Sequence, residues 1–499
     1  MQKSLEIYNE TNRKLKALAY CGFLSGWDIN TEMPPKANHE AELSALSEMS
    51  YTLQTSDEYS AAVDDLYAHR DELSDVLKHE IEAAVLSKQK LKKVPMDEYV
   101  EYGALLNRFY NVYVEAKNKS DFALALPYYE KVVEFKRKYV LWQQTDELSG
   151  YDVLLDEFEK GTSRKQYDEF FALLKEKLVP LIKKINGKKL PFDDSFNKKY
   201  YSEEGQKRFQ EYLRGVVGFT PDHTVVKESE HPFTSGYGKT DVRITNHFYA
   251  DNFLSSVYSA IHEMGHGMYE MQVSDEVDKT MSGGGASMAM HESQSRFLEN
   301  IIGRSKSFWE THFEKLKEIF PENLDGVTAN DLYLLSNRAE CSLVRTEADE
   351  LTYSLHIMVR YEIEKGLLNG QIEAKDIPSE WNRLYKEYLG IDVPSDKEGC
   401  LQDVHWACGD FGYFPTYALG SAYASQIYHA MQKDLDVAAE IRTGSFSGIE
   451  KWLAEKIHRF GASKDPKDIL FYATGEEFNP NYYIDYLVGK YSKLYGLDA

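Results

Sequence analysis

Residues 262–266 read His-Glu-Met-Gly-His, a pattern that can bind one metal ion only if this stretch is an α-helix. On a helix, residues at positions i and i+4 lie one above the other, so both imidazoles can reach the same ion. Two such histidines predict zinc, which binds imidazole nitrogen and keeps one coordination position open in catalytic sites. Glu263, beside the first histidine, would then accept a proton from a water molecule. The motif therefore predicts a helix that carries a hydrolytic zinc site.

A catalytic zinc ion also needs a third protein ligand, and a carboxylate on a following helix is a common source. Glu292 lies 26 positions after His266, in a helix that we expect over about residues 288–302. We predict that it completes the site. Glu270 shares the face of the two histidines, but it lies too far along the helix axis from His262 to bind the same ion. The rivals for the third position are Glu270, Glu299 and His291.

The balance of charged residues limits the partners of the chain. The 81 acidic and 58 basic side chains among 499 residues give a formal net charge of −23, which disfavours nucleic acid or an anionic membrane surface as a partner. No stretch approaches the roughly 20 apolar residues of a membrane span, and the N-terminus lacks the apolar core of a signal peptide. The four cysteines have no CxxC spacing and suit a reducing compartment. We therefore expect a cytoplasmic protein that binds neither nucleic acid nor membrane.

Apolar residues at helical spacing over long stretches, with only 14 prolines in the chain, predict a mainly helical protein. The first helix is expected over residues 1–24, ending near Gly22 and Gly26, and the prolines of the stretch 27–35 predict a break before the next helix. No internal repeat or long linker divides the chain. We therefore expect residues 1–499 to form a single domain.

One region departs from the helical pattern. Residues 218–251 contain β-branched residues at 225–226 and 242–245, which suit short strands. The sequence thus predicts a small sheet directly before the motif helix, with Asp251 as the N-cap of that helix. A strand of this sheet could bind a peptide by adding it to its edge.

Several motifs follow one another along the chain in a characteristic order. They are His231-Pro232-Phe233, Asp-Val-Arg-Ile-Thr at 241–245, the pentapeptide at 262–266, His-Glu-Ser-Gln at 291–294, Arg-Thr-Glu-Ala-Asp at 345–349, and Gly-Cys-Leu-Gln-Asp-Val-His-Trp at 399–406. With these motifs the sequence resembles the thermostable, Taq-type family of zinc metallocarboxypeptidases. Weaker matches, including Tyr-Asp-Val-Leu-Leu-Asp-Glu-Phe-Glu at 151–159, extend the similarity over nearly the whole length.

The resemblance implies a peptidase that releases single amino acids from peptide C-termini with broad specificity. It also implies a homodimer and a two-lobed, mainly helical fold with a deep groove, similar to neurolysin and angiotensin-converting enzyme, with the small sheet beside the active site. By the matching motifs, one zinc ion per chain, which cobalt could replace, would be held by His262, His266 and Glu292. Glu263 would be the general base, and Arg345 would bind the substrate carboxylate.

Removal of C-terminal residues requires a fixed cation one residue beyond the scissile bond. Arginine suits this role because its planar fork gives a carboxylate two parallel hydrogen bonds. Arg345 is the expected anchor, and Arg243 and Arg296 are its rivals. His231 is expected to help close the groove near the substrate end.

Hydrolysis also needs donors, besides the metal, for the oxyanion that forms on the scissile carbonyl. His405 and Tyr413 are the candidates in the glycine-rich stretch 399–420, and Tyr417 is an alternative.

Two other functions remain open. One is an endopeptidase or dipeptidase on the same helical scaffold, which a groove that stays open beyond Arg345 would allow. The other is a metal-stabilised peptide-binding protein without turnover. Glu263 argues against the latter, because a purely structural metal site closes its fourth position with a side chain and needs no base.

Overall fold

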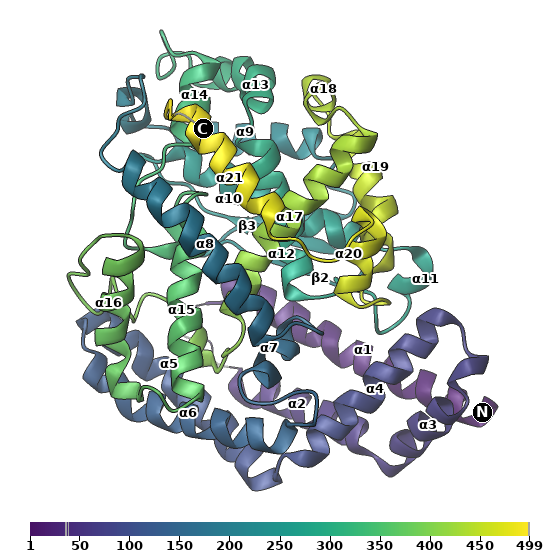
Figure 1. Ribbon diagram of the computed structural model, residues 1–499. Helices are drawn as coiled ribbons and strands as arrows, with labels where there is room; N and C mark the ends of the chain where they lie inside the picture. The colour runs from purple at the N-terminus through teal and green to yellow at the C-terminus, as the bar shows by residue number, and fades with distance from the viewer. Residues whose placement is uncertain (35–36, 38, 498–499) are drawn as a thin grey trace.

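The computed structural model describes residues 1–34, 37 and 39–497. Helices make up most of this part of the chain, and they surround one small three-stranded sheet (Figure 1). The predicted mainly helical class with a small sheet is therefore confirmed. Among the described residues, we find no helix with the length and hydropathy needed to span a membrane.

The elements follow one another in two helical stretches that flank the sheet. Before the sheet lie α1 (Gln2–Thr31), α2 (Glu40–Thr55), α3 (Asp57–Ala68), η1 (Arg70–Glu72), α4 (Asp75–Lys93), α5 (Met96–Lys119), α6 (Phe122–Gln143), α7 (Asp152–Phe158), α8 (Arg164–Ile185), η2 (Ser195–Lys198) and α9 (Glu203–Val216). The strands are β1 (Thr224–Glu228), β2 (Thr234–Gly236) and β3 (Val242–Asn246). After them lie α10 (Phe253–Met271), α11 (Asp275–Asp278), α12 (Met288–Arg296), η3 (Phe297–Gly303), α13 (Lys306–Ile319), α14 (Ala329–Ser336), η4 (Arg345–Glu347), α15 (Tyr353–Leu368), η5 (Ala374–Asp376), α16 (Ile377–Tyr388), η6 (His405–Cys408), α17 (Phe414–Asp434), α18 (Val437–Arg442), α19 (Ser447–Lys456), η7 (His458–Phe460), α20 (Pro466–Thr474) and α21 (Asn481–Leu494).

The first helix is longer than the sequence predicts. α1 continues through Gly22 and Gly26 to Thr31, so the predicted end near these glycines is wrong. Trp27, beyond both glycines, is buried, and its ring packs against Phe233 with centroids 5.8 Å apart. This tertiary contact outweighs the cost of about 1 kcal/mol that each glycine imposes on a helix. Of the predicted break, Pro35 lies outside the described residues.

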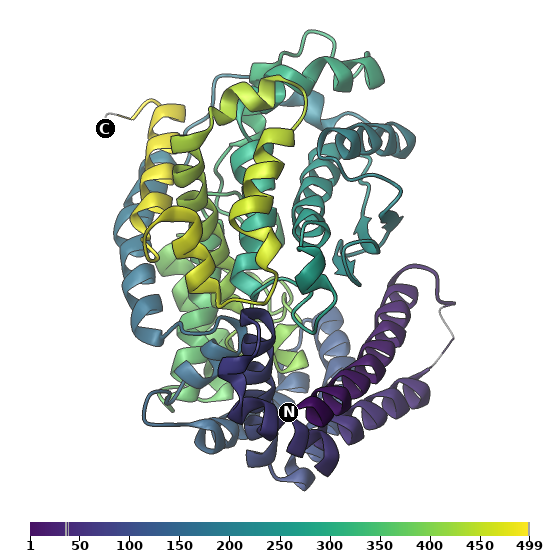
Figure 2. The same cartoon turned by 90° about the vertical axis from the view of Figure 1, so that its right-hand side faces the viewer.

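Strand β3 lies at the centre of the sheet, with β1 parallel to it and β2 antiparallel on its other side. The β-branched stretches predicted as strands fall within β1 and β3, as expected. The sequence Thr-Ser-Gly of β2 has little β-propensity and was not predicted, because it becomes a strand only through its pairing with β3. The sheet packs against α10, and α1 lies beside the sheet at the edge of the molecule (Figure 2).

The start of α10 differs from the prediction. The helix begins at Phe253, Asn252 occupies the N-cap position, and no side chain caps it, so the assignment of Asp251 as N-cap is wrong. Burial of an aromatic ring fixes the boundary instead, because the Phe253 side chain is fully buried and stacks on Tyr201 with centroids 4.2 Å apart.

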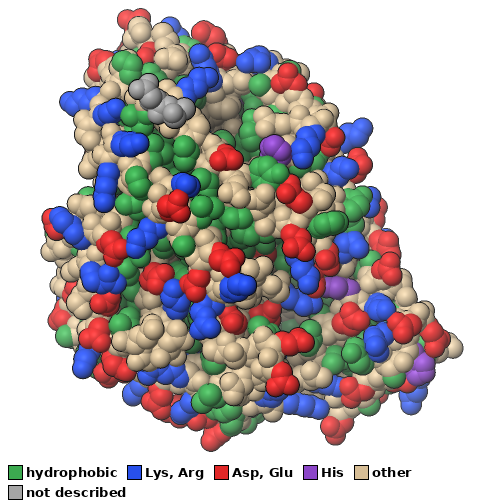
Figure 3. Space-filling view, viewed as in Figure 1, with side chains coloured by type: hydrophobic (Ala, Val, Ile, Leu, Met, Phe, Trp, Pro, Cys, Tyr) green, Lys and Arg blue, Asp and Glu red, His purple; other side chains and the backbone are tan. Residues whose placement is uncertain are grey.

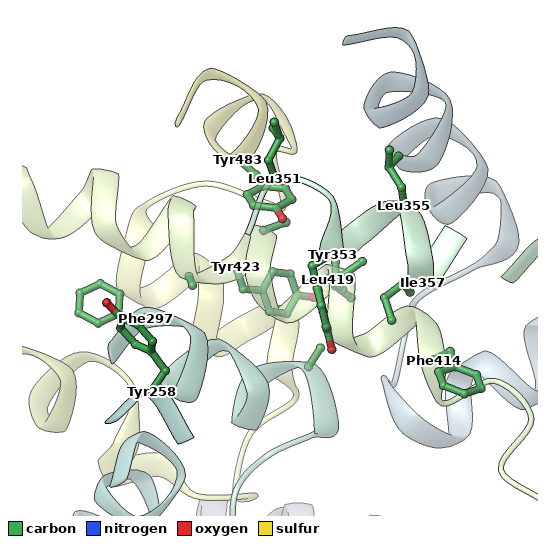
Figure 4. Close-up of a cluster of buried hydrophobic side chains, with 14 of the residues drawn as sticks. Tyr258, Phe297, Leu351, Tyr353, Leu355, Ile357, Phe414, Leu419, Tyr423 and Tyr483 are labelled. Atoms are coloured by element: carbon green, nitrogen blue, oxygen red, sulfur yellow. The ribbon is translucent and has the colours of Figure 1, made fainter. Parts of the chain in front are cut away.

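Helix α12 lies between α10 and α17 and touches both of their backbones. A Cβ atom added to Gly265 of α10 would lie 2.7 Å from the Gln294 carbonyl oxygen, and one added to Gly420 of α17 would lie 2.7 Å from Glu292 Cβ. The two glycines therefore permit an approach that any larger residue would prevent. Around this crossing, buried side chains from α10, η3, α15, α17 and α21 fill the interior (Figure 4). Glu292 is thus held at the centre of the core.

The surface shows no sign of a single charged interface on the face in Figure 3. Acidic and basic side chains are interspersed there, with apolar side chains between them (Figure 3). On this face the charge imbalance of the chain is spread out rather than gathered into one patch.

Candidate metal and catalytic site

Two helices bring the three predicted metal ligands together. His262 and His266 lie on α10 and Glu292 on α12, and one ligand atom from each lies within 4.8 Å of the others. Glu292 Oε2 is 3.7 Å from His262 Nε2 and 3.4 Å from His266 Nε2. A tetrahedral zinc ion with bonds of about 2.0–2.2 Å would hold such atoms roughly 3.3–3.6 Å apart. The cluster therefore fits zinc, and it is the one cluster of this kind that the described residues form.

The outer nitrogen of His262 is held by Glu299, one of the rival ligands. Glu299 lies on η3, a π-helix, and its Oε2 atom is 2.9 Å from His262 Nδ1. Arg296 and Arg304 form ion pairs with the same carboxylate at 3.1 and 2.8 Å. Because Nδ1 is occupied, Nε2 is the nitrogen that faces Glu292. Glu299 therefore contacts His262 on the side away from the cluster.

The other two rivals form a chain behind His266. His291 Nε2 is 2.7 Å from Glu270 Oε1, and His291 Nδ1 is 2.7 Å from His266 Nδ1. A carboxylate can only accept, so a neutral His291 donates from Nε2 to Glu270 and accepts at Nδ1. His266 must then donate from Nδ1, which leaves its Nε2 unprotonated and able to bind a metal ion. The chain thus fixes the tautomer of His266.

The charges around the cluster also favour a cation. Burial lowers the pKa of His266 to about 4, so its ring is neutral near pH 7. Burial also opposes the charged forms of His262 and Glu292, but charged neighbours outweigh it. Glu292 and Glu299 raise the pKa of His262 overall, and Arg296 together with the two histidines holds the pKa of Glu292 below its usual range. A deprotonated carboxylate and a neutral imidazole are the forms that ligate a metal, and Glu292 and His266 are in these forms.

Glu263 is oriented by the sheet. Thr234 of β2 donates to Glu263 Oε2 at 2.6 Å and lies 3.0 Å from its backbone carbonyl. Among the described residues no donor contacts Oε1. Burial raises the pKa of Glu263, with smaller contributions from nearby carboxylates. The side chain thus has one fixed oxygen and one free oxygen.

Arg345, the predicted carboxylate anchor, is buried and already paired. Its Nε and Nη2 atoms donate to Asp403 Oδ1 at 3.1 and 2.8 Å, and Nη1 donates to the Tyr353 hydroxyl at 3.1 Å. Arg360 donates to the other oxygen of Asp403 at 2.7 Å. Two guanidinium groups thus share one carboxylate, so the cluster carries one positive charge in excess.

The rival arginines have other partners. Arg243 forms two parallel hydrogen bonds with Asp241 at 2.7 and 2.8 Å, and its guanidinium lies over the ring of Phe23 in α1. Arg296 donates to Glu292 Oε1 at 2.7 Å and lies beside the cluster. His231 is exposed in the loop between β1 and β2. These contacts make Arg243 a link between the sheet and α1, and Arg296 a partner of the metal-ligand candidate.

The predicted oxyanion donors gather at the start of α17. His405 Nε2 is 3.2 Å from the Tyr417 hydroxyl, and the rings of Tyr413 and Tyr417 lie edge to face, 5.1 Å apart. Burial raises the pKa of Tyr413 to about 12, so its hydroxyl stays protonated and can donate. Burial lowers the pKa of His405 to about 4. The structure therefore brings together His405 of η6, Tyr413 at the N-cap position of α17, and Tyr417 of α17, the helix that packs against Glu292.

Sequence reasoning missed three residues of the site. Asp403 lies two positions before His405 in the motif at 399–406, so the sequence did hold a signal, namely an acidic residue that could pair with a buried arginine. Thr234 and Tyr353 gave no such signal, because a single threonine in the stretch 218–251 and one tyrosine among 36 have no distinguishing pattern.

The chain is similar to known proteins over nearly its whole length. Residues 7–491 match the model of a family described as carboxypeptidase Taq (M32) metallopeptidase. Carboxypeptidase 1 of Bacillus subtilis (strain 168) is 41% identical over 475 residues, 95% of each chain. Thermostable carboxypeptidase 1 of Pyrococcus furiosus is 33% identical over 490 residues, 96% of each chain. The crystal structure of the M32 carboxypeptidase from Deinococcus radiodurans R1 superposes with a TM-score of 0.94 at 31% identity, covering 99% of this chain and 100% of the other.

Proposed function

The chain belongs to the carboxypeptidase Taq (M32) metallopeptidase family and is a metallocarboxypeptidase, and from this premise we propose that it releases single C-terminal amino acids from peptides with one zinc ion bound. The ligands are His262, His266 and Glu292. The observation that carries this proposal is the convergence of their three ligand atoms, with the Glu263 carboxylate near enough to interact electrostatically with His262 and Glu292. Two imidazoles and one carboxylate suit catalytic zinc, and cobalt is a chemically reasonable substitute.

Glu263 is the general base of the proposed reaction. A bound zinc ion would polarise the scissile carbonyl and lower the pKa of a water molecule. Glu263 Oε1 takes the proton of that water, while the bond from Thr234 keeps the carboxylate from rotating. The raised pKa of Glu263 makes it a better base near neutral pH. After attack on the carbonyl, the same carboxyl group gives the proton to the leaving amine.

Arg345 binds the substrate carboxylate. The excess positive charge that Arg345 and Arg360 share around Asp403 supports this role, because a peptide carboxylate would neutralise it. In a chain of net charge −23, a carboxylate needs such a local cation. Arg243 is the weaker candidate, because its guanidinium already donates two parallel hydrogen bonds to Asp241. His231, exposed in the loop before β2, helps to close the groove near the substrate end.

The oxyanion is stabilised by Tyr413 and His405, with Tyr417 as the alternative. A protonated tyrosine hydroxyl and a neutral imidazole are both suitable donors. Their position beside the helix of Glu292 supports this role, because the oxyanion would form next to the metal ligands.

The substrate backbone lies along β2. Phe233 and Tyr237, on either side of β2, form backbone hydrogen bonds towards β3. Alternate residues of a strand face opposite edges, so the backbone groups of Thr234 and Gly236 point away from β3. An extended peptide could add to this edge, which would bring its scissile carbonyl towards Glu263.

Two further proposals concern the architecture and the setting of the whole protein. We propose that residues 1–499 form one catalytic domain of two helical lobes around a deep groove, comparable to neurolysin and angiotensin-converting enzyme. We also propose that the protein works as a cytoplasmic homodimer on peptides, without nucleic acid or membrane partners.

Metal analysis and mass spectrometry of a digested peptide together test this function. We expect one zinc ion per chain and a ladder of products that each lack one more C-terminal residue. A peptide with an amidated C-terminus should resist cleavage. Internal cleavage of the amidated peptide would instead favour the endopeptidase or dipeptidase, and zinc binding without any cleavage would favour the peptide-binding protein.

A further inference from the structure

The segment 151–159, matched by its sequence Tyr-Asp-Val-Leu-Leu-Asp-Glu-Phe-Glu, has no part in the proposed mechanism. It contains α7, whose side chains Val153, Leu154 and Leu155 are buried in the core. Nevertheless, its two ends contact three elements that build the site, namely α12, α17 and the loop that precedes α17.

At the C-terminal end of the segment, Glu159 holds the start of α12. Its carboxylate is fully buried, with Oε2 accepting from the Ala289 backbone at 3.1 Å and Oε1 from the Tyr423 hydroxyl of α17 at 3.3 Å. The first N–H groups of a helix have no partner within the helix, and in the protein interior an acceptor must be supplied. Glu292 follows Ala289 by three residues, so Glu159 fixes the first turn of the helix that carries this ligand.

The same end of the segment supports Tyr413. The ring of Phe158 meets the ring of Tyr413 edge to face, with centroids 5.2 Å apart and planes at 76°. Such edge-to-face pairs are favourable beyond the area that they bury, because the positive edge of one ring meets the negative face of the other. This contact restricts the direction in which the Tyr413 hydroxyl can point.

The residue before Tyr413 is also fixed by this segment. A Cβ atom added to Gly412 would lie 2.4 Å from the Leu154 carbonyl oxygen, and Gly412 has a φ of +95°. Its N–H donates to Glu364 at 2.7 Å, and the Tyr151 hydroxyl donates to the same buried carboxylate. The backbone that leads into Tyr413 therefore rests directly on the segment.

We infer that residues 151–159 set the position of Tyr413 relative to Glu292, with Phe158 acting on the Tyr413 ring and Glu159 on the start of α12. Both are positioning residues, because neither touches a metal ligand atom or the free oxygen of Glu263. The inference rests on the proposed role of Tyr413 as an oxyanion donor.

The first test is a double-mutant cycle between Phe158 and Tyr413. Phe158→Leu should lower kcat about tenfold with little change in KM. A donor that is displaced from the oxyanion loses part of the 10²–10³-fold increase in kcat that such hydrogen-bond donors contribute. Phe158→Tyr keeps the ring contact and should restore kcat. Because Phe158 acts through Tyr413, the double variant Phe158→Leu with Tyr413→Phe should be no slower than Tyr413→Phe alone. Phe192→Leu, the same change at another half-buried ring, is the matched control and should leave kcat unchanged.

The outcomes separate the inference from the proposed function. If Tyr413→Phe leaves kcat unchanged, the oxyanion role of Tyr413 fails, and the inference fails with it. If Tyr413→Phe lowers kcat but Phe158→Leu does not, or if the two effects add, only the positioning role is overturned.

The second test measures zinc affinity by competition with a chelator, which does not depend on turnover. Glu159→Ala should weaken zinc binding about tenfold, because the loss of a residue that helps to orient metal ligands typically lowers metal affinity by such a factor. Glu159→Gln keeps an acceptor oxygen and should bind zinc nearly as well as the wild type. Glu350→Ala removes another buried glutamate, which pairs with Lys490 at 2.6 Å, and should reduce stability without changing zinc affinity. Equal zinc affinity in Glu159→Ala and the wild type would overturn the role of Glu159.

Discussion

Arg345 Nη1 donates to the Tyr353 hydroxyl at 3.1 Å, and the Arg296 guanidinium lies over the Tyr353 ring, 4.1 Å from the ring centroid. Arg296 in turn pairs with Glu292 at 2.7 Å. Tyr353 therefore connects the proposed carboxylate anchor to a proposed metal ligand through three consecutive contacts. The distance between these groups decides how many residues are removed in each step, so this connection bears on the exopeptidase character of the enzyme.

Replacement of Tyr353 by Phe should weaken substrate binding. The change removes one hydrogen bond to a buried guanidinium, a loss of about 1.5–3 kcal/mol for a bond to a charged group. We expect kcat/KM for free-acid peptides to fall tenfold or more, mainly through KM, with zinc content unchanged. Tyr483→Phe, which removes a hydroxyl bonded to Ser354 instead, serves as the control. An unchanged KM in Tyr353→Phe would show that Tyr353 does not act on the anchor.

Replacement of Arg345 by Met should abolish the preference for a free C-terminus. We expect kcat/KM for a free-acid peptide to fall about 10²-fold or more, because a buried carboxylate contact is lost, while the slow cleavage of the matching amide stays the same. The ratio of the two rates is the measurement. Arg243→Met should leave this ratio intact, and a collapse of the ratio in Arg243→Met instead would make Arg243 the anchor.

Replacement of Glu263 by Gln should separate metal binding from turnover. Glu263→Gln should retain one zinc ion per chain and lose about 10³-fold in kcat, in line with the contribution of a general base. Thr234→Val should lower kcat by a smaller factor of about ten, since the carboxylate remains but is no longer oriented, and Thr234→Ser should restore it. Substantial activity in Glu263→Gln would require a different base.

Removal of His291 should weaken metal binding. His291→Ala removes the acceptor of the His266 Nδ1–H bond, so His266 no longer holds the required tautomer as firmly. Zinc affinity, measured with a chelating indicator, should fall about 10- to 100-fold. His312→Ala, at a buried histidine that contacts Tyr212 instead, is the control. Equal affinities in the two variants would mean that His291 does not support the site.

Glu364 should make the protein less stable as the pH rises. Burial raises its pKa to about 7 from an ordinary value of 4.5, despite donors from Tyr151, Trp406 and Gly412. The folded state thus binds a proton that the unfolded state releases at lower pH, and stability falls as the pH rises from about 4.5 to above 7. Glu364→Gln mimics the neutral acid and lacks this loss.

Urea unfolding at several pH values measures this effect. The unfolding free energy of Glu364→Gln relative to the wild type should rise between pH 5 and pH 8 by at most about 3 kcal/mol. A difference that stays constant with pH would show that Glu364 keeps an ordinary pKa in the folded protein.

Local sequence patterns predicted those features that depend on local geometry. The i, i+4 spacing of His262 and His266 is a property of one helix, and the β-branched residues of β3 are a local pattern typical of a strand. Contacts between residues that are distant in sequence cannot be predicted from such local patterns. The pairing of Arg345 with Asp403 joins residues on separate segments, and β2 exists only because β3 lies beside it. The end of α1 was misjudged for the same reason, because Trp27 is buried by a residue from the sheet region.

The contact of Gly265 with α12 changes how the pentapeptide 262–266 should be understood. Metal binding and catalysis require particular residues only at its first, second and fifth positions, and they place no requirement on the third and fourth. In this fold the fourth letter is specified as well, since a methyl group there would collide with the backbone of the next helix. Met264, the third letter, is fully buried. Substitutions tolerated at these two positions should therefore depend on the neighbouring helix, so relatives that vary here are expected to change on both helices together.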